Sequence, residues 1–497
     1  MSSPSRFAFS EWPPALSETQ LEALTLYATT YALSHGLLYL PPVKPQPRVP
    51  NSAIHAPLSV FPSPFPLRLF LLARRLQSAY NILYARIAMD VEFLDKVMGS
   101  VEGVGKVDDF VGQLWTGWKN LRDEGIVQPL QLGLFRSDYL LHAGLNGEPL
   151  SLKQVEFNTI SSSFGTLSQH TAALHRYLYA TTSYYNVHPD MKPDDFPPND
   201  TTAGLVEGLA AAHAAYNAKE SKILFVVQAG ERNVFDQRLL EYELLEKHSI
   251  HVIRQTFDEL AASASIDSAT QALVISGATE ISTVYFRAGY TPTDYPTAAQ
   301  YATRFLLERS RAIKCPSIAL QLAGGKKVQQ VLTQPGVLAR FLTDAAQIAE
   351  LRSSWMGMWG LDEAAGAQRA RDMAERLVLK PQREGGGNNV YKEAIPAFLD
   401  ALPPLERQAW IAMELIVPPE GTGNYLVRAG SEGAQSAVKA EVVSELGIFG
   451  WALFGGPDGG LKEKEVGWLV RTKGKDSNEG GVATGFSVLD SILLVND

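Results

Sequence analysis

Hydrophobic positions follow helical spacing over most of the first part of the chain. Residues 17–36 and 66–142 show this spacing, as in the row Leu72, Leu76, Leu83 and Ile87, and we expect both stretches to be mostly helical. A proline-rich linker at 41–50 separates them. Residues 152–160 predict a strand that runs into a loop, and residues 170–182 return to helical spacing.

A different pattern begins at residue 222. An apolar strand is predicted at 222–228, followed by a helix from about Asp236 to Lys247 and by strands at 251–257 and 282–290. Strands that alternate with helices are typical of parallel βαβ units. We therefore expect residues 222–325 to form an inserted α/β subdomain with an open parallel sheet.

The last third of the chain predicts successive strands. They lie at 377–382, 410–417, 441–454 and 467–474, and glycine-rich turns separate them, which favours an antiparallel sheet. The predicted organisation has three parts: a helical part at 1–221, the inserted subdomain at 222–325, and a strand-rich part with glycine-rich loops at 326–497.

Composition narrows the classes of function. The chain has 497 residues, too many for one hydrophobic core, and a formal net charge of -9, which argues against nucleic acid as the main partner. Its one cysteine, Cys315, excludes an internal disulfide and a cysteine-rich zinc site. The start lacks a secretion-signal pattern, and arginines interrupt the best apolar run, so we expect a cytoplasmic protein that does not span a membrane.

The segment KPQREGGGNNVY at 380–391 is the sharpest candidate for phosphate chemistry. Lys380 ends a predicted strand, and Gly385, Gly386 and Gly387 allow backbone N–H groups to approach phosphate oxygens closely. Glu384 stands where a carboxylate could hold magnesium. A flexible surface loop is an equal alternative, and the pattern of a P-loop NTPase is absent.

A second candidate is QVEFNTISSSFG at 154–165. On a strand, Glu156 and Asn158 point to one face and Phe157 to the other, which offers a carboxylate and an amide oxygen as ligands of the kind magnesium prefers. Ser161, Ser162 and Ser163 follow. From spacing alone, a partly exposed strand that ends in a serine turn is the more common explanation.

Cationic and polar side chains mark three more segments. Arg471 and Lys473 share one face of a predicted strand, which indicates either an anion site or an edge strand protected by charge. Arg287 follows another strand and could hold a carboxylate or pair with a surface acid.

Glu231, Asn233 and Gln237 follow the strand at 222–228, where open α/β sheets bind ligands. They could bind the ammonium and carboxylate groups of an amino acid, or simply cap a helix.

Together these segments resemble the eukaryotic type of glutathione synthetase, an ATP-grasp ligase. The matching blocks occur in the family's order: LFRSDY at 134–139, KQVEFNTISSSFG at 153–165, ERNVFDQR at 231–238, ERSRAIKCPSIALQLAGGKKVQQ at 308–330, KPQREGGGNNVY, SELGIFG at 444–450, and RTKGKDSNEGGVATG at 471–485. Ala288 departs from the family, which often has an acidic residue there. Residues 1–130 match less distinctively.

The resemblance implies a set of binding residues. Two magnesium ions would be held by Glu156, Asn158 and Glu384. ATP would be bound by Glu156, Lys326, Lys380, Gly385, Gly386, Gly387, Asn389, Tyr391, Met413, Glu414, Leu415, Ile416, Glu445, Lys473 and Glu479. The substrates would be bound by Arg136, Ile160, Ser161, Ser162, Ser163, Glu231, Asn233, Gln237, Arg287, Ala288, Gly289, Tyr290, Arg471, Val482 and Ala483. Arg136, Lys380 and Arg471 would be catalytic.

The resemblance also implies an activity and an assembly. It implies an ATP-grasp α/β fold with an antiparallel sheet and a glycine-rich lid, and a homodimer. The activity would be ATP-dependent ligation of γ-glutamylcysteine to glycine through an acyl phosphate, giving glutathione, ADP and phosphate. A ligase for another amine such as β-alanine or serine, a silent nucleotide-binding protein, and a kinase remain as alternatives.

Overall fold

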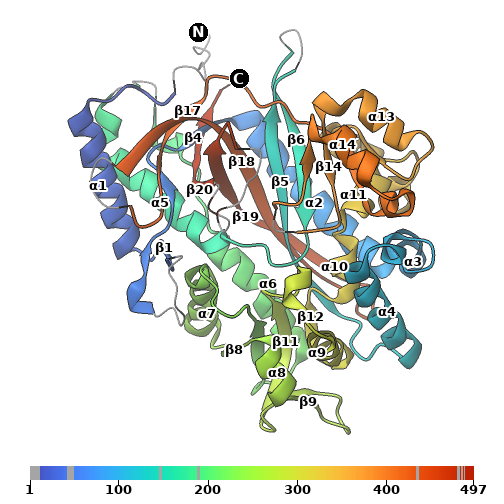
Figure 1. Cartoon of the computed structure of the whole chain (residues 1–497). Helices are drawn as coiled ribbons and strands as arrows, with labels where there is room; N and C mark the ends of the chain where they lie inside the picture. The colour runs from blue at the N-terminus through green and yellow to red at the C-terminus, as the bar shows by residue number, and fades with distance from the viewer. Residues whose placement is uncertain are drawn as a thin grey trace.

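A large mixed sheet forms the centre of the molecule, with helices packed around it (Figure 1). The computed structural model describes residues 12–41, 50–144, 148–186, 188, 191–384, 386–431, 436–477, 482, 485 and 487–496. Within them the central sheet has 13 strands. Strands at one end pair antiparallel and those at the other end mostly parallel, so the predicted α/β fold with both kinds of pairing is confirmed.

The strands of the central sheet follow an order unlike that of the chain. Along its main path lie β17 (Gly423–Val427), β3 (Leu58–Ser59), β20 (Ser487–Asp490), β19 (Leu461–Gly474), β18 (Ala437–Phe454), β5 (Gln131–His142), β12 (Ile313–Cys315), β11 (Thr279–Phe286), β10 (Leu273–Ile275) and β9 (Ala264–Ile266). Beside this path, β6 (Ser151–Asn158) pairs with β5, and β7 (Lys222–Val226) pairs with β11 and β8 (Val252–Gln255).

Helix α2 (Leu67–Met89) covers one face of the sheet. Its Tyr84 ring stacks on Phe157 of β6 with centroids 4.0 Å apart, and Phe157 also contacts Phe135 of β5. Phe157 therefore points into the core, as the period of a strand predicts, and its neighbours Glu156 and Asn158 point to the other face.

Helices α5 (Gly165–Thr182) and α6 (Thr201–Tyr216) cover part of that other face. Gly208 of α6 lies so close to the sheet that an added Cβ would meet the Trp451 ring at 2.8 Å and Leu134 at 3.1 Å. Glycine therefore lets α6 pack directly on β5 and β18.

A second, smaller sheet has four antiparallel strands in the order β13 (Met358–Gly360), β16 (Ile411–Glu414), β14 (Leu377–Lys380) and β15 (Val390–Tyr391). It has its own apolar cluster, which includes Trp359, Leu377, Leu379, Ile395 and Ala412. Two pairs of short strands complete the sheets: β1 (Leu38–Tyr39) with β2 (Ile54–His55), and β4 (Ser63–Pro66) with β21 (Ile492–Val495).

The remaining helices surround the two sheets (Figure 1). They are α1 (Glu18–Ser34), α3 (Val91–Met98), α4 (Asp109–Glu124), α7 (Val234–His248), α8 (Phe257–Ser263), α9 (Ala298–Arg309), α10 (Ile318–Ala323), α11 (Lys326–Leu332), α12 (Ala345–Ser353), α13 (Gly366–Asp372) and α14 (Ala394–Ala401). In the described part of the chain, none of the helices has both the length and the apolar character that a membrane crossing requires.

A strand of the central sheet differs most clearly from the sequence prediction. Residues 131–142 were expected to be helical but form strand β5. Most of this strand is buried on both faces, so it lacks the alternation that distinguishes a strand from a buried helix. β12 pairs with β5 and so joins the parallel strands of the sheet to the antiparallel strands. The predicted boundaries of the inserted subdomain, at residues 222 and 325, stay a prediction.

Candidate active site

The candidate site lies where two strands share one edge of β5. Residues Arg136 to His142 of β5 pair with β6, whereas Gln131 pairs with Lys314 of β12. β18 occupies the opposite edge along residues 131–139. The chain leaves the sheet after Asn158 and enters a loop. Polar side chains of β5, β6, β18 and β19 contact one another beside this loop.

Two arginines converge there on one buried carboxylate. Arg136 donates to Asp138 through Nε at 2.6 Å and Nη2 at 2.8 Å, and Arg471 Nη2 of β19 donates to the same carboxylate at 3.0 Å. Arg471 also pairs closely with Glu445 of β18. β19 pairs with β18 on one side and β20 on the other, so the edge-strand explanation for Arg471 and Lys473 is wrong.

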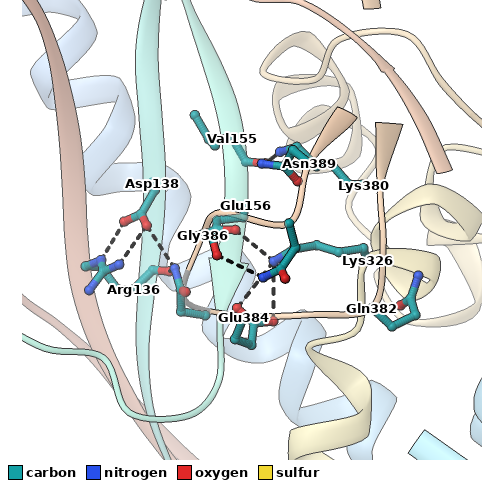
Figure 2. A network of polar contacts seen from close by, with 12 residues as sticks. Arg136, Asp138, Val155, Glu156, Lys326, Lys380, Gln382, Glu384, Gly386 and Asn389 are labelled. Carbon is teal, nitrogen blue, oxygen red and sulfur yellow. Dashed lines mark hydrogen bonds and ion pairs between the residues drawn. The ribbon is translucent and has the colours of Figure 1, made fainter. Parts of the chain in front are cut away.

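Glu156 and Glu384, far apart in the sequence, meet at one lysine (Figure 2). Lys326, the first residue of α11, places its Nζ 2.7 Å from Glu156 and 3.3 Å from Glu384. The side chain of Lys326 is only 6% exposed, whereas those of Glu156 and Glu384 are 24% and 25% exposed. Both carboxylates therefore remain accessible to a small ligand.

The charges shift one another's protonation. Burial alone would raise the pKa of Glu156, but Lys326 and Lys380 outweigh it and hold this pKa well below its ordinary value. Burial raises the pKa of Glu384. The negative charge of Glu156 raises this pKa further, whereas Lys326 opposes the rise. Burial lowers the pKa of Lys380, and the positive charge of Lys326 adds to this decrease.

Asn158 completes a set of hard oxygen donors. Its Nδ2 donates to the Arg136 carbonyl at 3.1 Å and to Asp138 at 2.9 Å. Because both partners can only accept, the amide oxygen must point away from them. Glu156, Glu384 and Asn158 thus offer two carboxylates and an amide oxygen, which fits the chemistry of magnesium. In the described residues, no group of three His, Cys, Asp or Glu side chains forms a metal site by itself.

The glycine loop begins next to these carboxylates. Gly386 and Gly387 have φ of 74° and 77°, a region that glycine adopts without strain. Before the loop, Lys380 of β14 donates to the Val155 carbonyl of β6 at 3.2 Å (Figure 2). Gln382 accepts from the Lys327 N–H at 3.0 Å and donates to the Ala409 carbonyl at 3.0 Å, so the loop is held against the start of α11.

The serine loop after β6 is held by two arginines. Arg287 donates to the Ser162 carbonyl at 3.1 Å and to Ser163 Oγ at 2.5 Å, and Arg136 Nη1 donates to the Ser163 carbonyl at 3.2 Å. Ser161 donates to the carbonyl of Phe286 at the end of β11. Arg287 is only 3% exposed, so the alternative of a surface ion pair is wrong.

A buried aspartate connects this loop to α7. Asp236 accepts from the backbone N–H groups of Phe164 at 2.8 Å, Thr166 at 3.0 Å and Leu167 at 3.2 Å, and from the Thr166 hydroxyl. The N-cap of α5, Phe164, has no side-chain cap of its own. Asp236 therefore caps α5 from another helix.

Polar residues at the start of α7 form a chain of hydrogen bonds. Gln237 donates to Glu231 at 3.2 Å, and Arg254 of β8 donates to Gln237 Oε1 at 2.6 Å. Asn233 at the N-cap makes no side-chain cap, and its buried Oδ1 lacks a partner in the described part of the chain. The simple helix-cap explanation is therefore wrong for Asn233, whose oxygen is suited to a ligand.

The structure also shows the surroundings of several other residues predicted to bind ATP or the substrates. Ile160, Ala288 and Val482 are buried, whereas Gly289 has a φ of 96° and donates its N–H to Asp294. Asn389 donates to Tyr391 Oη at 3.2 Å.

A pocket of about 430 Å³ lies beside the end of β16 and is lined by Glu414, Lys153, Trp355 and Met356 among others. Met413 precedes Glu414 on β16, and Leu415 and Ile416 follow that strand. Gly385, Glu479 and Ala483 lie outside the described residues.

Sequence patterns alone did not single out four of these residues. Asp138, Asp236 and Arg254 each contact a predicted site residue or loop, and Gln382 holds the glycine loop against the start of α11. Asp138 and Asp236 lie inside the matching blocks LFRSDY and ERNVFDQR, which is the one signal that could have drawn attention to them.

Comparisons with known proteins agree over nearly the whole chain. Residues 18–494 match the family model described as the ATP-binding domain of eukaryotic glutathione synthase. The chain is 39% identical to the glutathione synthetase of Homo sapiens, covering 97% of this chain and 98% of that one. It is 36% identical to that of Dictyostelium discoideum, covering 96% of this chain and 100% of the relative.

A solved structure has the same architecture. The apo form of a glutathione synthetase-like effector from Globodera pallida superposes with a TM-score of 0.75 at 25% identity, covering 97% of this chain and 98% of that one. Another relative, 39% identical, is the chloroplastic glutathione synthetase of Solanum lycopersicum, of which 78% is covered by 89% of this chain.

Proposed function

The chain belongs to the eukaryotic glutathione synthetase family, and from that premise we propose that it uses ATP to join γ-glutamylcysteine to glycine, with release of ADP and phosphate. One observation carries the proposal: Lys326 draws Glu156 and Glu384 together beside the buried pair Arg136 and Arg471. Groups suited to a nucleotide with its metal thus adjoin groups suited to a carboxylate.

The nucleotide end of the site combines cations with a glycine loop. Lys326 and Lys380 are placed to contact phosphate oxygens, and the backbone of Gly385, Gly386 and Gly387 would follow the phosphate chain. Residues 413–416, beside the pocket of about 430 Å³, would contact the adenine edge. Asn389, Tyr391, Glu445, Lys473 and Glu479 would complete this part of the site.

Two magnesium ions would be held by Glu156, Asn158 and Glu384. Bound magnesium would supply charge neutralisation to the phosphates. The match of two carboxylates and one correctly oriented amide oxygen supports this assignment.

The peptide end of the site would take γ-glutamylcysteine and glycine. The serine loop and the start of α7 would bind the dipeptide through Ile160, Ser161, Ser162, Ser163, Glu231, Asn233, Gln237, Arg287, Ala288, Gly289 and Tyr290. Arg136 and Arg471, with Val482 and Ala483, would bind the carboxylates at the point of ligation. Arginine suits this role because its planar fork matches a carboxylate.

The reaction proceeds in two steps. The cysteinyl carboxylate attacks the γ-phosphate of ATP, which releases ADP and leaves an acyl phosphate. The glycine amine then attacks the acyl carbon, the C–O bond to phosphate breaks, and the amine loses a proton. Arg136 and Arg471 stabilise the negative charge that forms on the acyl oxygen, an effect of about 3 kcal/mol for a single well-placed donor.

The acyl phosphate must be protected from water. We assign this protection to the glycine-rich segments 385–387 and 480–485, which would close over the site as lids. Gly386 and Gly387 have positive φ values, so other residues would be strained at these two positions.

The experiment that tests the function measures ADP release together with the mass of the peptide product. Full activity should require γ-glutamylcysteine and glycine together, with one glutathione per ADP. ADP release that needs no amine would indicate a kinase, and no release under any condition would indicate a silent protein. Faster product formation with β-alanine or serine would show that the acceptor is wrong.

The family resemblance implies a homodimer, and we propose the cytoplasm as the compartment. The buried, reduced Cys315 is compatible with a reducing compartment. Light scattering in solution tests the dimer, and a mass of 54.3 kDa, that of one chain, would contradict it. A fluorescent fusion in cells tests the compartment.

A further inference from the structure

We infer that Asp138 is a positioning residue that holds two carboxylate-binding arginines and a metal-binding amide in one arrangement. The inference rests on the proposed function and extends it, because Asp138 itself lies behind the groups that would meet substrate. Its side chain is completely buried, and its partners Arg136, Arg471 and Asn158 come from three strands.

The contacts of Asp138 leave each partner little freedom. Its Oδ1 accepts from Arg136 Nε at 2.6 Å, and its Oδ2 accepts from Arg136 Nη2 at 2.8 Å, Asn158 Nδ2 at 2.9 Å and Arg471 Nη2 at 3.0 Å. The paired bonds to Arg136 fix the plane of its guanidinium group. Arg136 Nη1 remains directed toward the Ser163 carbonyl, 3.2 Å away.

The same carboxylate orients Asn158. An amide rotated by 180° would bring its oxygen against the Asp138 oxygen and the Arg136 carbonyl, which is unfavourable because all three groups only accept. Asp138 therefore keeps the amide oxygen of Asn158 directed away from its own carboxylate and from the Arg136 carbonyl. One buried group thus links the carboxylate-binding and metal-binding ends of the site.

The carboxylate of Asp138 lies among both positive and negative charges. The negative charge of Asp138 contributes to the raised pKa of Glu384 and of Glu445, after the larger effect of burial. A buried charge close to like charges carries an energetic cost. The ion pairs with Arg136 and Arg471 offset this cost, and the same contacts fix the positions of the two arginines and of Asn158.

Asp490 provides a matched control. It is also a fully buried carboxylate in the central sheet, but it accepts from the hydroxyl groups of Ser63 and Thr472, and among the described residues it forms no ion pair with an arginine. Thr472 follows Arg471 on β19 and so points to the opposite face of the sheet. Asp490→Asn removes a buried charge without touching the site.

The test compares glycine with glycinamide as acceptors in wild type, Asp138→Asn and Asp490→Asn. Glycinamide lacks the carboxylate, so the ratio of kcat/KM for the two amines measures carboxylate recognition. A general loss of folded protein lowers both values equally and leaves the ratio unchanged. We expect Asp138→Asn to reduce the ratio at least tenfold, and Asp490→Asn to leave it at the wild-type value.

A second readout needs no turnover. Mn²⁺ binding in the presence of ADP, followed by the electron paramagnetic resonance of free Mn²⁺, should weaken at least threefold in Asp138→Asn and stay unchanged in Asp490→Asn. If Asp138→Asn does not fold, Asp138→Ser, which leaves room for water between the arginines, should change both readouts in the same direction.

The outcomes separate the two proposals. An unchanged acceptor ratio in folded Asp138→Asn would overturn the hold on the arginines, and unchanged Mn²⁺ binding would overturn the hold on Asn158. Wild-type protein that uses neither amine would contradict the proposed function instead, and Mn²⁺ binding would then decide the role of Asp138.

Discussion

Replacing Asp236 by asparagine should destabilise the protein by about 2–4 kcal/mol, because α5 has no cap of its own. In the native chain, Oδ1 of Asp236 accepts from the N–H groups of Thr166 and Leu167, and Oδ2 accepts from the N–H of Phe164 at 2.8 Å. An asparagine of the same shape has one oxygen, so an NH₂ group must face one of these buried donors.

The magnitude follows from these contacts. Leaving one buried N–H without an acceptor costs about 1–3 kcal/mol, and the loss of negative charge weakens the remaining hydrogen bonds by about 1 kcal/mol together. This is a large fraction of the roughly 5–15 kcal/mol by which most domains are stable. Because the same contacts hold the serine loop, the KM for γ-glutamylcysteine should also rise.

The assay is urea unfolding followed by circular dichroism, with Asp344→Asn as the control. Asp344 accepts from the N–H groups of Ala346 at 2.8 Å and Gln347 at 3.2 Å at the start of α12, but it is exposed. Asparagine is an equally good exposed cap, so the control should change stability by less than about 0.5 kcal/mol. An Asp236→Asn protein as stable as the control would refute the reasoning.

Four further predictions concern the site and the core. Lys380→Ala should lower kcat/KM for ATP about 100-fold while the fold stays intact, whereas exposed Lys392→Ala should not; equal turnover would remove Lys380 from the phosphate site. Gly386→Pro should uncouple or abolish turnover, because proline cannot adopt the φ of 74° found there; normally coupled kinetics would refute the lid. EDTA should silence the enzyme and Mg²⁺ restore it, and activity in metal-free buffer would remove Glu156, Asn158 and Glu384 from the mechanism. Burial lowers the pKa of His175 in the folded chain, so the unfolded chain binds more protons below about pH 6.5. The free energy of unfolding should therefore fall as the pH drops from 7 to 5, and it should fall less in His175→Gln. Identical pH profiles of the two proteins would contradict this.

Local patterns in the sequence predicted much of the site's secondary structure. The period of a strand placed Glu156 and Asn158 on one face and Phe157 in the core, and β6 has this arrangement. The strand that ends at Lys380 and the open α/β pattern from residue 222 are also present. Each of these depends on neighbours in the sequence.

Local sequence patterns do not predict features that depend on contacts between distant strands. The sequence spacing of Glu156 and Glu384 does not predict that both contact the same lysine. Only the family resemblance implies that these two residues share a site. The sequence of residues 131–142 does not predict a strand, because a strand buried on both faces has no alternation of polar and apolar residues. Asp236 looks like an ordinary first-turn acid of α7, and only the folded chain brings it to α5.

The most direct test of the central claim follows an oxygen atom from substrate to product. γ-Glutamylcysteine labelled with oxygen-18 in both oxygens of its cysteinyl carboxylate is incubated with ATP, Mg²⁺ and glycine, and the phosphate released is examined by mass spectrometry. Ligation through an acyl phosphate predicts one labelled oxygen in every phosphate. Unlabelled phosphate, formed alongside glutathione, would contradict the account.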